Sequence, residues 1–137
     1  MMKTLVLYYS YSGKTKKIAQ ELAVKESAEI VEIMDTKRPG KLKAYTAGII
    51  ASIRGKAWSV ESLEVALADY DRIILLAPVW ADNTPPSVNA MLEQLPEGKN
   101  VTIKLVSGSG KSGCKERLEA IIKSKGGVMN GFEDIKA

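Results

Sequence analysis

The sequence of 137 residues contains no histidine and a single cysteine, Cys114. One cysteine excludes a disulfide within the chain, and the lack of histidine argues against a transition-metal site. We therefore expect no metal site and a reducing, cytoplasmic environment. Apolar runs fall far short of the ~20 residues that a membrane helix needs, and the stretch Met1-Met2-Lys3 carries no cleavable signal. The sequence thus predicts no membrane span.

The excess of positive charge is small. A total of 20 Lys and Arg residues against 16 Asp and Glu residues gives a formal net charge of +4. This excess favours anionic ligands or partners, but it is well below the level typical of nucleic-acid-binding proteins, so we expect no nucleic acid. Hydrophobic residues make up 45% of the chain, which is enough for one core, and the length suits a single domain over residues 1–137.

Apolar runs alternate with helical periodicity along the chain. Strands are expected at residues 3–9, 28–34, 72–77, 101–106 and 127–136, the last with a bulge near Gly131. Helices are expected at residues 13–25, 41–58, 86–95 and 114–125, with a helical turn at 61–68. This alternation predicts an α/β fold, a doubly wound parallel sheet of five strands with helices on both faces and right-handed crossovers.

The first expected strand runs directly into a turn rich in hydroxyl groups. The turn is Ser10-Tyr11-Ser12-Gly13-Lys14-Thr15, and helical periodicity begins at once after it. The N–H groups at a helix N-terminus point outward and the helix dipole favours negative charge there. Serine and threonine hydroxyls add donors, and Gly13 allows the backbone to approach closely. The pattern predicts an anion site, with a phosphate ester as the ligand.

Two further segments follow expected strands and differ from ordinary turns. Pro78–Pro85 offers an aromatic side chain, Trp80, between stiffening prolines, and Ser107–Gly113 offers small residues whose backbone can lie against a ring. Ligands of open parallel sheets bind beyond the carboxyl ends of the strands. A phosphate site beside an aromatic platform therefore suggests flavin mononucleotide (FMN). Trp58 lacks such flanking residues, and we expect it to be core or surface cover.

Together the three segments resemble the flavodoxin family, over nearly the whole chain. Ser10–Thr15 is similar to that family's phosphate loop, Ser/Thr-x-Ser/Thr-Gly-x-Thr, while Pro78–Trp80 and Ser107–Gly110 are similar to its two ring-binding loops. The resemblance implies the strand order 2-1-3-4-5 and FMN as cofactor. The cofactor-binding residues that it implies are Ser10, Tyr11, Ser12, Gly13, Lys14, Thr15, Pro78, Val79, Trp80, Asn83, Thr84, Ser107, Gly108, Ser109 and Gly110.

The sequence departs from the family pattern in three ways. Electron carriers of the family are usually acidic, whereas this chain is basic. The segment Ser107–Gly113 has no stacking aromatic, so one ring face is expected to be open to a substrate or a partner. The family usually ends in a helix after the fifth strand, whereas this chain stops at Ala137, so we expect the C-terminal helix to be missing. Lys104 should then lie on an open sheet face, with its amine in water and with homodimerisation as one outcome.

The sequence leaves three functions open. The first is an FMN-binding carrier that transfers one or two electrons between partner proteins. The second is an FMN-dependent oxidoreductase that takes hydride from NAD(P)H and reduces a quinone or similar acceptor. The third is a cofactor-free interaction module on the same fold. No side chain stands out as a general acid or base, and Cys114 is expected to be buried and inert.

Two segments imitate the loop that binds nucleotide triphosphates, Gly-x4-Gly-Lys-Ser/Thr. They are residues 12–15 and 109–112. The first glycine of that motif would fall at Tyr8 in one case and at Leu105 in the other. Both segments therefore fail the motif, and triphosphate hydrolysis is not expected.

Overall fold

The computed structural model describes residues 3–36, 47–54 and 57–137. Five parallel strands form one sheet in the order β2-β1-β3-β4-β5, which confirms the predicted fold and strand order. A shift in the pairing of β4 with β5 leaves Asn130 as the extra residue of a bulge, next to the expected Gly131. The strands are β1 (Thr4–Tyr8), β2 (Glu29–Glu32), β3 (Arg72–Pro78), β4 (Asn100–Ser107) and β5 (Val128–Lys136).

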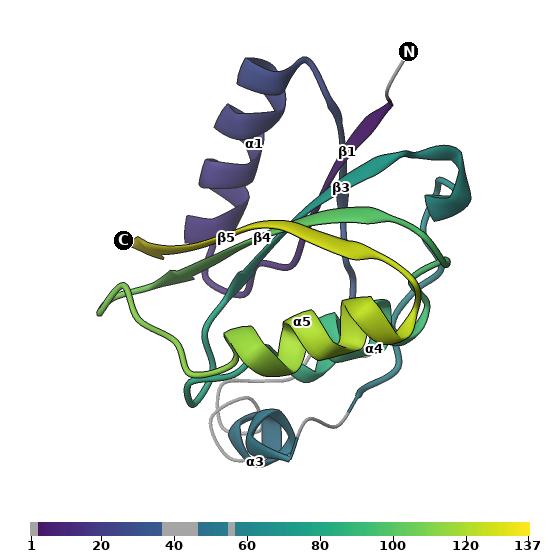
Figure 1. The fold of residues 1–137 in the computed structure, drawn as a ribbon. Helices are drawn as coiled ribbons and strands as arrows, with labels where there is room; N and C mark the ends of the chain where they lie inside the picture. Colours follow the sequence, from purple (N-terminus) through teal and green to yellow (C-terminus); the bar gives the residue numbers. More distant parts are fainter. Residues whose placement is uncertain (1–2, 37–46, 55–56) are drawn as a thin grey trace.

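Helices cover both faces of the sheet (Figure 1). Helix α1 (Lys14–Glu26) packs on one face, and α4 (Pro86–Glu93) and α5 (Lys115–Ser124) pack on the other. The short helix α3 (Ile49–Ile53) lies below α4 and α5 in Figure 1, and η2 (Leu67–Asp69) is a single 3₁₀ turn. Three of the four expected helices are thus confirmed.

The helix expected at residues 41–58 is only partly present. Residues 41–46 and 55–56 lie outside the described residues, and within the described part the α-helix is limited to α3, while residues 57–59 have no regular structure. The expected turn at 61–68 is likewise reduced to η2. The reason is that this segment hydrogen-bonds elsewhere: the Trp58 N–H donates to the Pro86 carbonyl, and the Glu61 N–H donates to the Met34 carbonyl.

Strict alternation along the central strands divides the core into two clusters. The larger one lies under α4 and α5 and takes from the strands Leu5, Leu7, Ile73, Leu75, Val101, Ile103 and Leu105. The smaller one lies under α1 and comprises Val6, Tyr8, Ile74 and Leu76 together with Ala19 and Ala23. Because β1 and β3 are buried on both faces, they hold the loops at their carboxyl ends on a rigid base.

Lys104 lies on the face of the sheet that α1 covers only in part. It is in register with Leu76, so it shares the α1 face, but α1 packs over β1, β2 and β3. The expected placement is confirmed, with one difference: the Lys104 ammonium is 2.7 Å from the Glu133 carboxylate on β5. Its neighbours Thr102 and Val106 are 8% and 4% exposed, so little apolar area remains open there.

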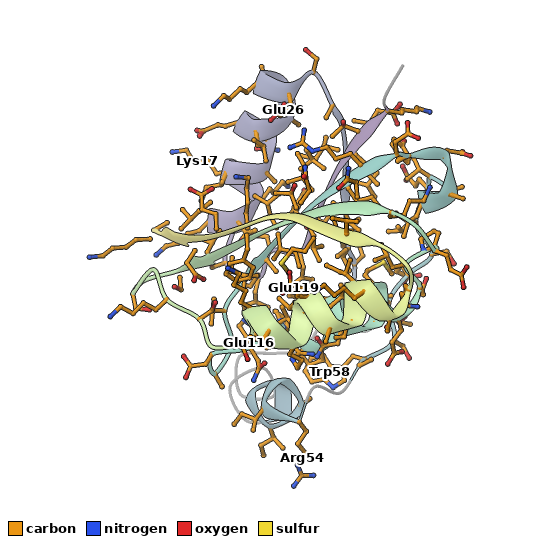
Figure 2. The ribbon with its side chains drawn as sticks, viewed as in Figure 1. Lys17, Glu26, Arg54, Trp58, Glu116 and Glu119 are labelled. Atoms are coloured by element: carbon orange, nitrogen blue, oxygen red, sulfur yellow. The ribbon has the colours of Figure 1, made fainter. Side chains whose placement is uncertain are left out.

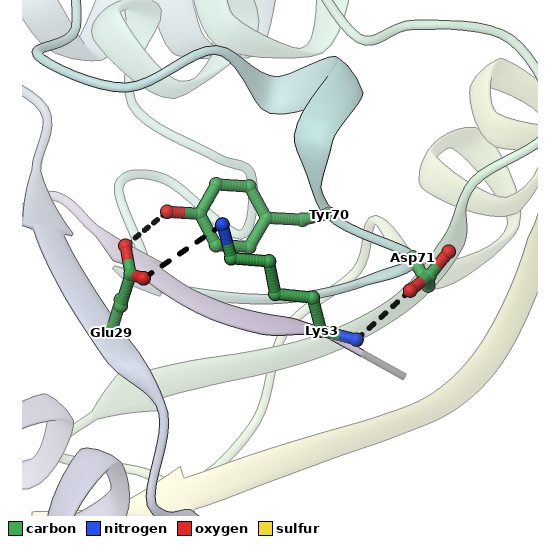
Figure 3. Close-up of polar contacts among 4 residues, drawn as sticks. All are labelled: Lys3, Glu29, Tyr70 and Asp71. Atoms are coloured by element: carbon green, nitrogen blue, oxygen red, sulfur yellow. Dashed lines mark hydrogen bonds and ion pairs between the residues drawn. The ribbon is translucent and has the colours of Figure 1, made fainter. Parts of the chain in front are cut away.

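A polar cluster closes the amino edge of the sheet (Figure 3). The Tyr70 hydroxyl donates to the Glu29 carboxylate, and the Lys3 backbone N–H donates to Asp71 at 2.9 Å. The Lys3 ammonium lies 4.9 Å from the centre of the Tyr70 ring. Burial, followed by the contact with Glu29, raises the pKa of Tyr70 to about 12. This cluster ties β1, β2 and β3 together at the edge opposite the candidate site.

Candidate functional site

The loop between β1 and α1 has exposed residues at its tip and buried residues at both ends. Ser10 and Thr15 are 6% and 3% exposed, whereas Ser12, Gly13 and Lys14 face solvent. Gly13 has a φ of 102°, which favours glycine, and its N–H donates to the Ser10 hydroxyl at 3.1 Å. The sequence places these residues together as predicted, with their backbone at the N-terminus of α1.

The first turn of α1 is electrostatically unusual. It contains no acidic residue and no side chain caps it, while Lys14, Lys16 and Lys17 lie there. Cations at a helix N-terminus oppose the helix dipole, at a cost of about 0.3–1 kcal/mol each at the surface. Lys17 projects into solvent from α1 in Figure 2. This helix end is therefore suited to receive an anion.

The loop after β3 is a tight hairpin. Trp80 and Asn83 exchange two backbone hydrogen bonds, of 2.8 and 3.0 Å, and form an isolated bridge. The two residues between them, Ala81 and Asp82, have φ values of 50° and 63°. Left-handed backbone at both central positions is typical of a type I′ turn, which usually selects glycine or asparagine. The hairpin holds the backbone of Trp80 at the carboxyl end of β3.

Trp80 is the common member of an aromatic cluster. Its ring lies edge-to-face against Tyr9, Tyr11 and Trp58, with centroid distances of 6.1, 6.0 and 6.4 Å and interplanar angles of 76°, 79° and 74°. Tyr11 thus joins the phosphate-type loop to the hairpin. Trp58 was not expected at the site, and no local pattern in the sequence connects it with Trp80.

Asn83 and Thr84 point toward α5. The Arg117 guanidinium donates to the side-chain amide oxygen (Oδ1) of Asn83 at 3.2 Å and to the Thr84 hydroxyl at 2.6 Å. The Thr84 hydroxyl in turn donates to Asn89 at 2.6 Å, and Thr84 is fully buried. These side chains brace the hairpin in this structure. Pro78 ends β3, and the Val79 N–H donates to the Val106 carbonyl at 3.1 Å.

The loop after β4 is ordered by its own serines. The Ser107 hydroxyl accepts from the Gly110 N–H at 3.0 Å, and the Ser109 hydroxyl accepts from the Lys111 N–H at 3.2 Å. Gly108 is exposed, and an added Cβ there would meet nothing within 4 Å. At the end of the loop, the Gly113 N–H donates to the Asp82 carbonyl at 2.8 Å. The two ring-type loops are therefore in direct contact, as the strand order predicts.

Asp35 joins the ends of three elements beneath this edge. The Tyr9 hydroxyl donates to Asp35 at 2.7 Å, and the Ser87 hydroxyl at the start of α4 donates to its other oxygen. Tyr9 is 1% exposed and Ser87 is fully buried. This junction was not expected from the sequence, because its members come from distant segments. It holds Tyr9 firmly against Trp80.

Cys114 is 1% exposed, as expected, and burial raises the pKa of its thiol despite the nearby Arg117. Such a thiol is not reactive. Within residues 3–36, 47–54 and 57–137, no group of three or more acidic, cysteine or histidine side chains is placed to hold a metal ion. None of the helices in this part of the chain is long and apolar enough to cross a membrane.

No protein-family model and no curated protein matches the sequence. Solved structures do match. A protein from Bacteroides eggerthii described as a flavoprotein shares 19% identity at a TM-score of 0.81, over 97% of this chain and 87% of that one. A flavoprotein from Lactobacillus acidophilus, crystallised with FMN, shares 22% sequence identity at a TM-score of 0.71, over 96% of this chain and 92% of that one. Two-electron reduced Megasphaera elsdenii flavodoxin shares 17% sequence identity at a TM-score of 0.58, over 96% of this chain and 87% of that one. The chain therefore has a flavodoxin-like fold.

Proposed function

We propose that the chain binds FMN at the carboxyl edge of its sheet and acts in electron transfer. The observation that carries this proposal is the meeting of three loops at that edge, one of them at the unshielded N-terminus of α1. Two similar folds support it, because one was crystallised with FMN and another is a flavodoxin in its two-electron reduced form. When bound, FMN supplies the one- or two-electron chemistry, and the protein supplies position and electrostatics.

The phosphate of FMN would bind at the exposed tip of the loop at residues 10–15. Exposed Ser12 and Lys14 would supply the donors there, through the Ser12 backbone N–H and hydroxyl and the Lys14 ammonium, while the Gly13 N–H donates to Ser10 in this structure. A phosphate at this position would bring negative charge to the first turn of α1, which carries three lysines and no acidic residue. The buried Ser10 and Thr15 support the loop from below.

The ring of FMN would lie between the hairpin and the loop after β4. Trp80 is the aromatic surface of this region, and the backbone of Ser107–Gly110 is the polar one. Asn83 and Thr84 would contribute to the ring's surroundings through the hairpin that they brace, since Arg117 engages both side chains. This assigns them a supporting position and leaves ring contact to Pro78, Val79 and Trp80.

Titration of the apoprotein with FMN and with riboflavin tests the proposal. The two ligands share the ring and differ in the phosphate, so a phosphate-recognising loop must discriminate between them. Each charge-assisted hydrogen bond to the phosphate contributes about 1.5–3 kcal/mol. We expect FMN to bind at least 100-fold more tightly, as measured by quenching of flavin fluorescence. Equal affinities refute the assignment of the phosphate to this loop. If neither ligand binds, the proposed function is refuted, and the cofactor-free interaction module is the function that remains.

A second candidate is an FMN-dependent oxidoreductase acting on NAD(P)H and a quinone-type acceptor. The feature that favours it is the loop at residues 107–113, which has no aromatic side chain to cover the ring and whose serines bond to their own loop. Stopped-flow mixing of the FMN-loaded protein with NADPH separates the two candidates. Rapid bleaching of the flavin absorbance supports the enzyme, whereas slow bleaching, with fast exchange of electrons with a carrier protein, supports the carrier.

A further inference from the structure

The side chain of Trp80 is contacted by Trp58, which lies outside the three loops of the candidate site. Trp58 follows α3 in the chain and lies between α3 and the α4–α5 layer (Figure 2). Its indole lies edge-to-face against Trp80 at a centroid distance of 6.4 Å, while Tyr9, just after β1, and Tyr11, in the phosphate-type loop, also contact Trp80. Trp80 is therefore contacted by three rings from two segments, residues 9–11 and the segment after α3.

Gly48, the residue before α3, lies against both tryptophan rings, while Trp80 itself stays partly exposed. A Cβ added to Gly48 would lie 2.7 Å from Cζ3 and 3.2 Å from Cε3 of Trp80, and 3.2 Å from Cη2 of Trp58. The 2.7 Å distance is shorter than real Cβ contacts and the two 3.2 Å distances are tight, so a side chain at Gly48 would force the six-membered ring of Trp80 to move. Both tryptophans meet at this one glycine.

The backbone of Trp58 is also anchored. Its N–H donates to the carbonyl of Pro86 at 3.2 Å, at the first residue of α4. The next residue, Ser87, donates to Asp35, which accepts from Tyr9, and Tyr9 returns to Trp80. The contacts form a closed circuit from Trp80 through Trp58 and α4 back to Trp80.

We propose that Trp58 and Gly48 hold the Trp80 indole in one orientation beside the phosphate-type loop, and that they thereby act as positioning residues for FMN. This inference rests on the proposed function. Ordering a large side chain upon binding costs affinity, and a side chain that is already ordered avoids that cost. Loss of one aromatic contact corresponds to a change of roughly 2- to 12-fold in Kd. The orientation of the indole also sets the electrostatic surroundings of the ring, and hence its reduction potential.

The first arm of the test uses the apoprotein. Two tryptophans in edge-to-face contact give a coupled pair of bands in the far-ultraviolet circular dichroism spectrum. We expect this couplet in the wild type, and its loss in both Trp58→Phe and Trp80→Phe, with thermal unfolding confirming that each variant is folded. A couplet that is absent, or that survives Trp58→Phe, refutes the contact and the inference with it.

The second arm measures the Kd and the reduction potential of FMN. We expect Trp58→Ala and Gly48→Ala to raise Kd roughly 2- to 12-fold and to shift the potential, and Trp58→Phe to restore both. Phe132→Ala is the matched control, since it removes another partly buried ring, on β5. If Trp58→Ala differs from the wild type no more than Phe132→Ala does, Trp58 has no positioning role. If the wild type itself does not bind FMN, the proposed function is refuted, and the positioning role is refuted with it.

Discussion

Replacing Gly13 by alanine isolates the contribution of the phosphate-type loop. Gly13 has a φ of 102°, and an added Cβ would meet no atom within 4 Å. The cost is therefore one of backbone conformation alone, roughly 1–2 kcal/mol for a side chain forced into left-handed backbone. For a domain of this size the Tm should fall by about 3–8 °C. Because the Gly13 N–H lies in this loop, a change of backbone conformation there should alter the position of the N–H groups that would face the phosphate.

Gly98 provides the matched control. It has a φ of 73°, it also has open space around the Cβ position, and it precedes β4 at the opposite edge of the sheet. Gly98→Ala should lose a similar amount of stability and keep its affinity for FMN. Gly13→Ala should weaken FMN binding roughly 10- to 150-fold, because a lost charge-assisted hydrogen bond is worth about 1.5–3 kcal/mol.

The assay combines thermal unfolding, followed by circular dichroism, with fluorescence titration of FMN below the melting range. Because the two glycine variants should lose similar amounts of stability, a difference between their affinities for FMN reports on the binding site. The reasoning is refuted if both variants lose FMN affinity equally, or if Gly13→Ala binds FMN as tightly as the wild type.

Three further predictions concern the rest of the fold. Cys114 should react with Ellman's reagent only after unfolding, because burial raises its pKa; rapid modification of the native protein contradicts this. The Tyr70 pKa of about 12 lies above its unfolded value near 10, so its stability contribution is complete below about pH 10 and is lost as pH rises toward 12. Tyr70→Phe should flatten that part of the stability profile; if the unfolding free energy from urea titrations falls as steeply with pH in the variant as in the wild type, the raised pKa of Tyr70 is contradicted. Lys104→Glu should cost about 0.2–1 kcal/mol by placing like charges across β4 and β5, and adding Glu133→Lys should restore the Tm; additive losses exclude the pairing.

The parallel sheet and the three loops follow from local sequence patterns, whereas the strand order came from the resemblance to the flavodoxin family. The apolar runs of β1, β3 and β4 are short and continuous, and each ends in a distinctive turn, so their carboxyl ends could be placed at one edge. Lys104 was placed on the correct face because a buried lysine without a partner is costly. The partner itself, Glu133, required the register of β4 with β5, which the sequence does not specify.

The contacts of Trp58 could not be predicted in the same way. Helical periodicity extended through residue 58, whereas in the structure the Trp58 N–H donates to the Pro86 carbonyl and its ring contacts Trp80. The Asp35 junction is similar, since Tyr9 and Ser87 lie far from Asp35 in the sequence. Tertiary hydrogen bonds of this kind override local propensity. Homodimerisation through the face around Lys104 stays a prediction, which sedimentation of the wild type would test.

The measurement that tests the central claim most directly is a titration of the isotope-labelled apoprotein with FMN, followed through its backbone amide resonances. Binding at the carboxyl edge should shift the amides of Ser12, Gly13, Trp80 and Gly110 and leave Gly98, at the amino edge, unchanged. Repeating the titration with riboflavin should lose the shifts at Ser12 and Gly13 first, because the phosphate is absent. Shifts confined to the amino edge, or no shifts at saturating FMN, would contradict the account.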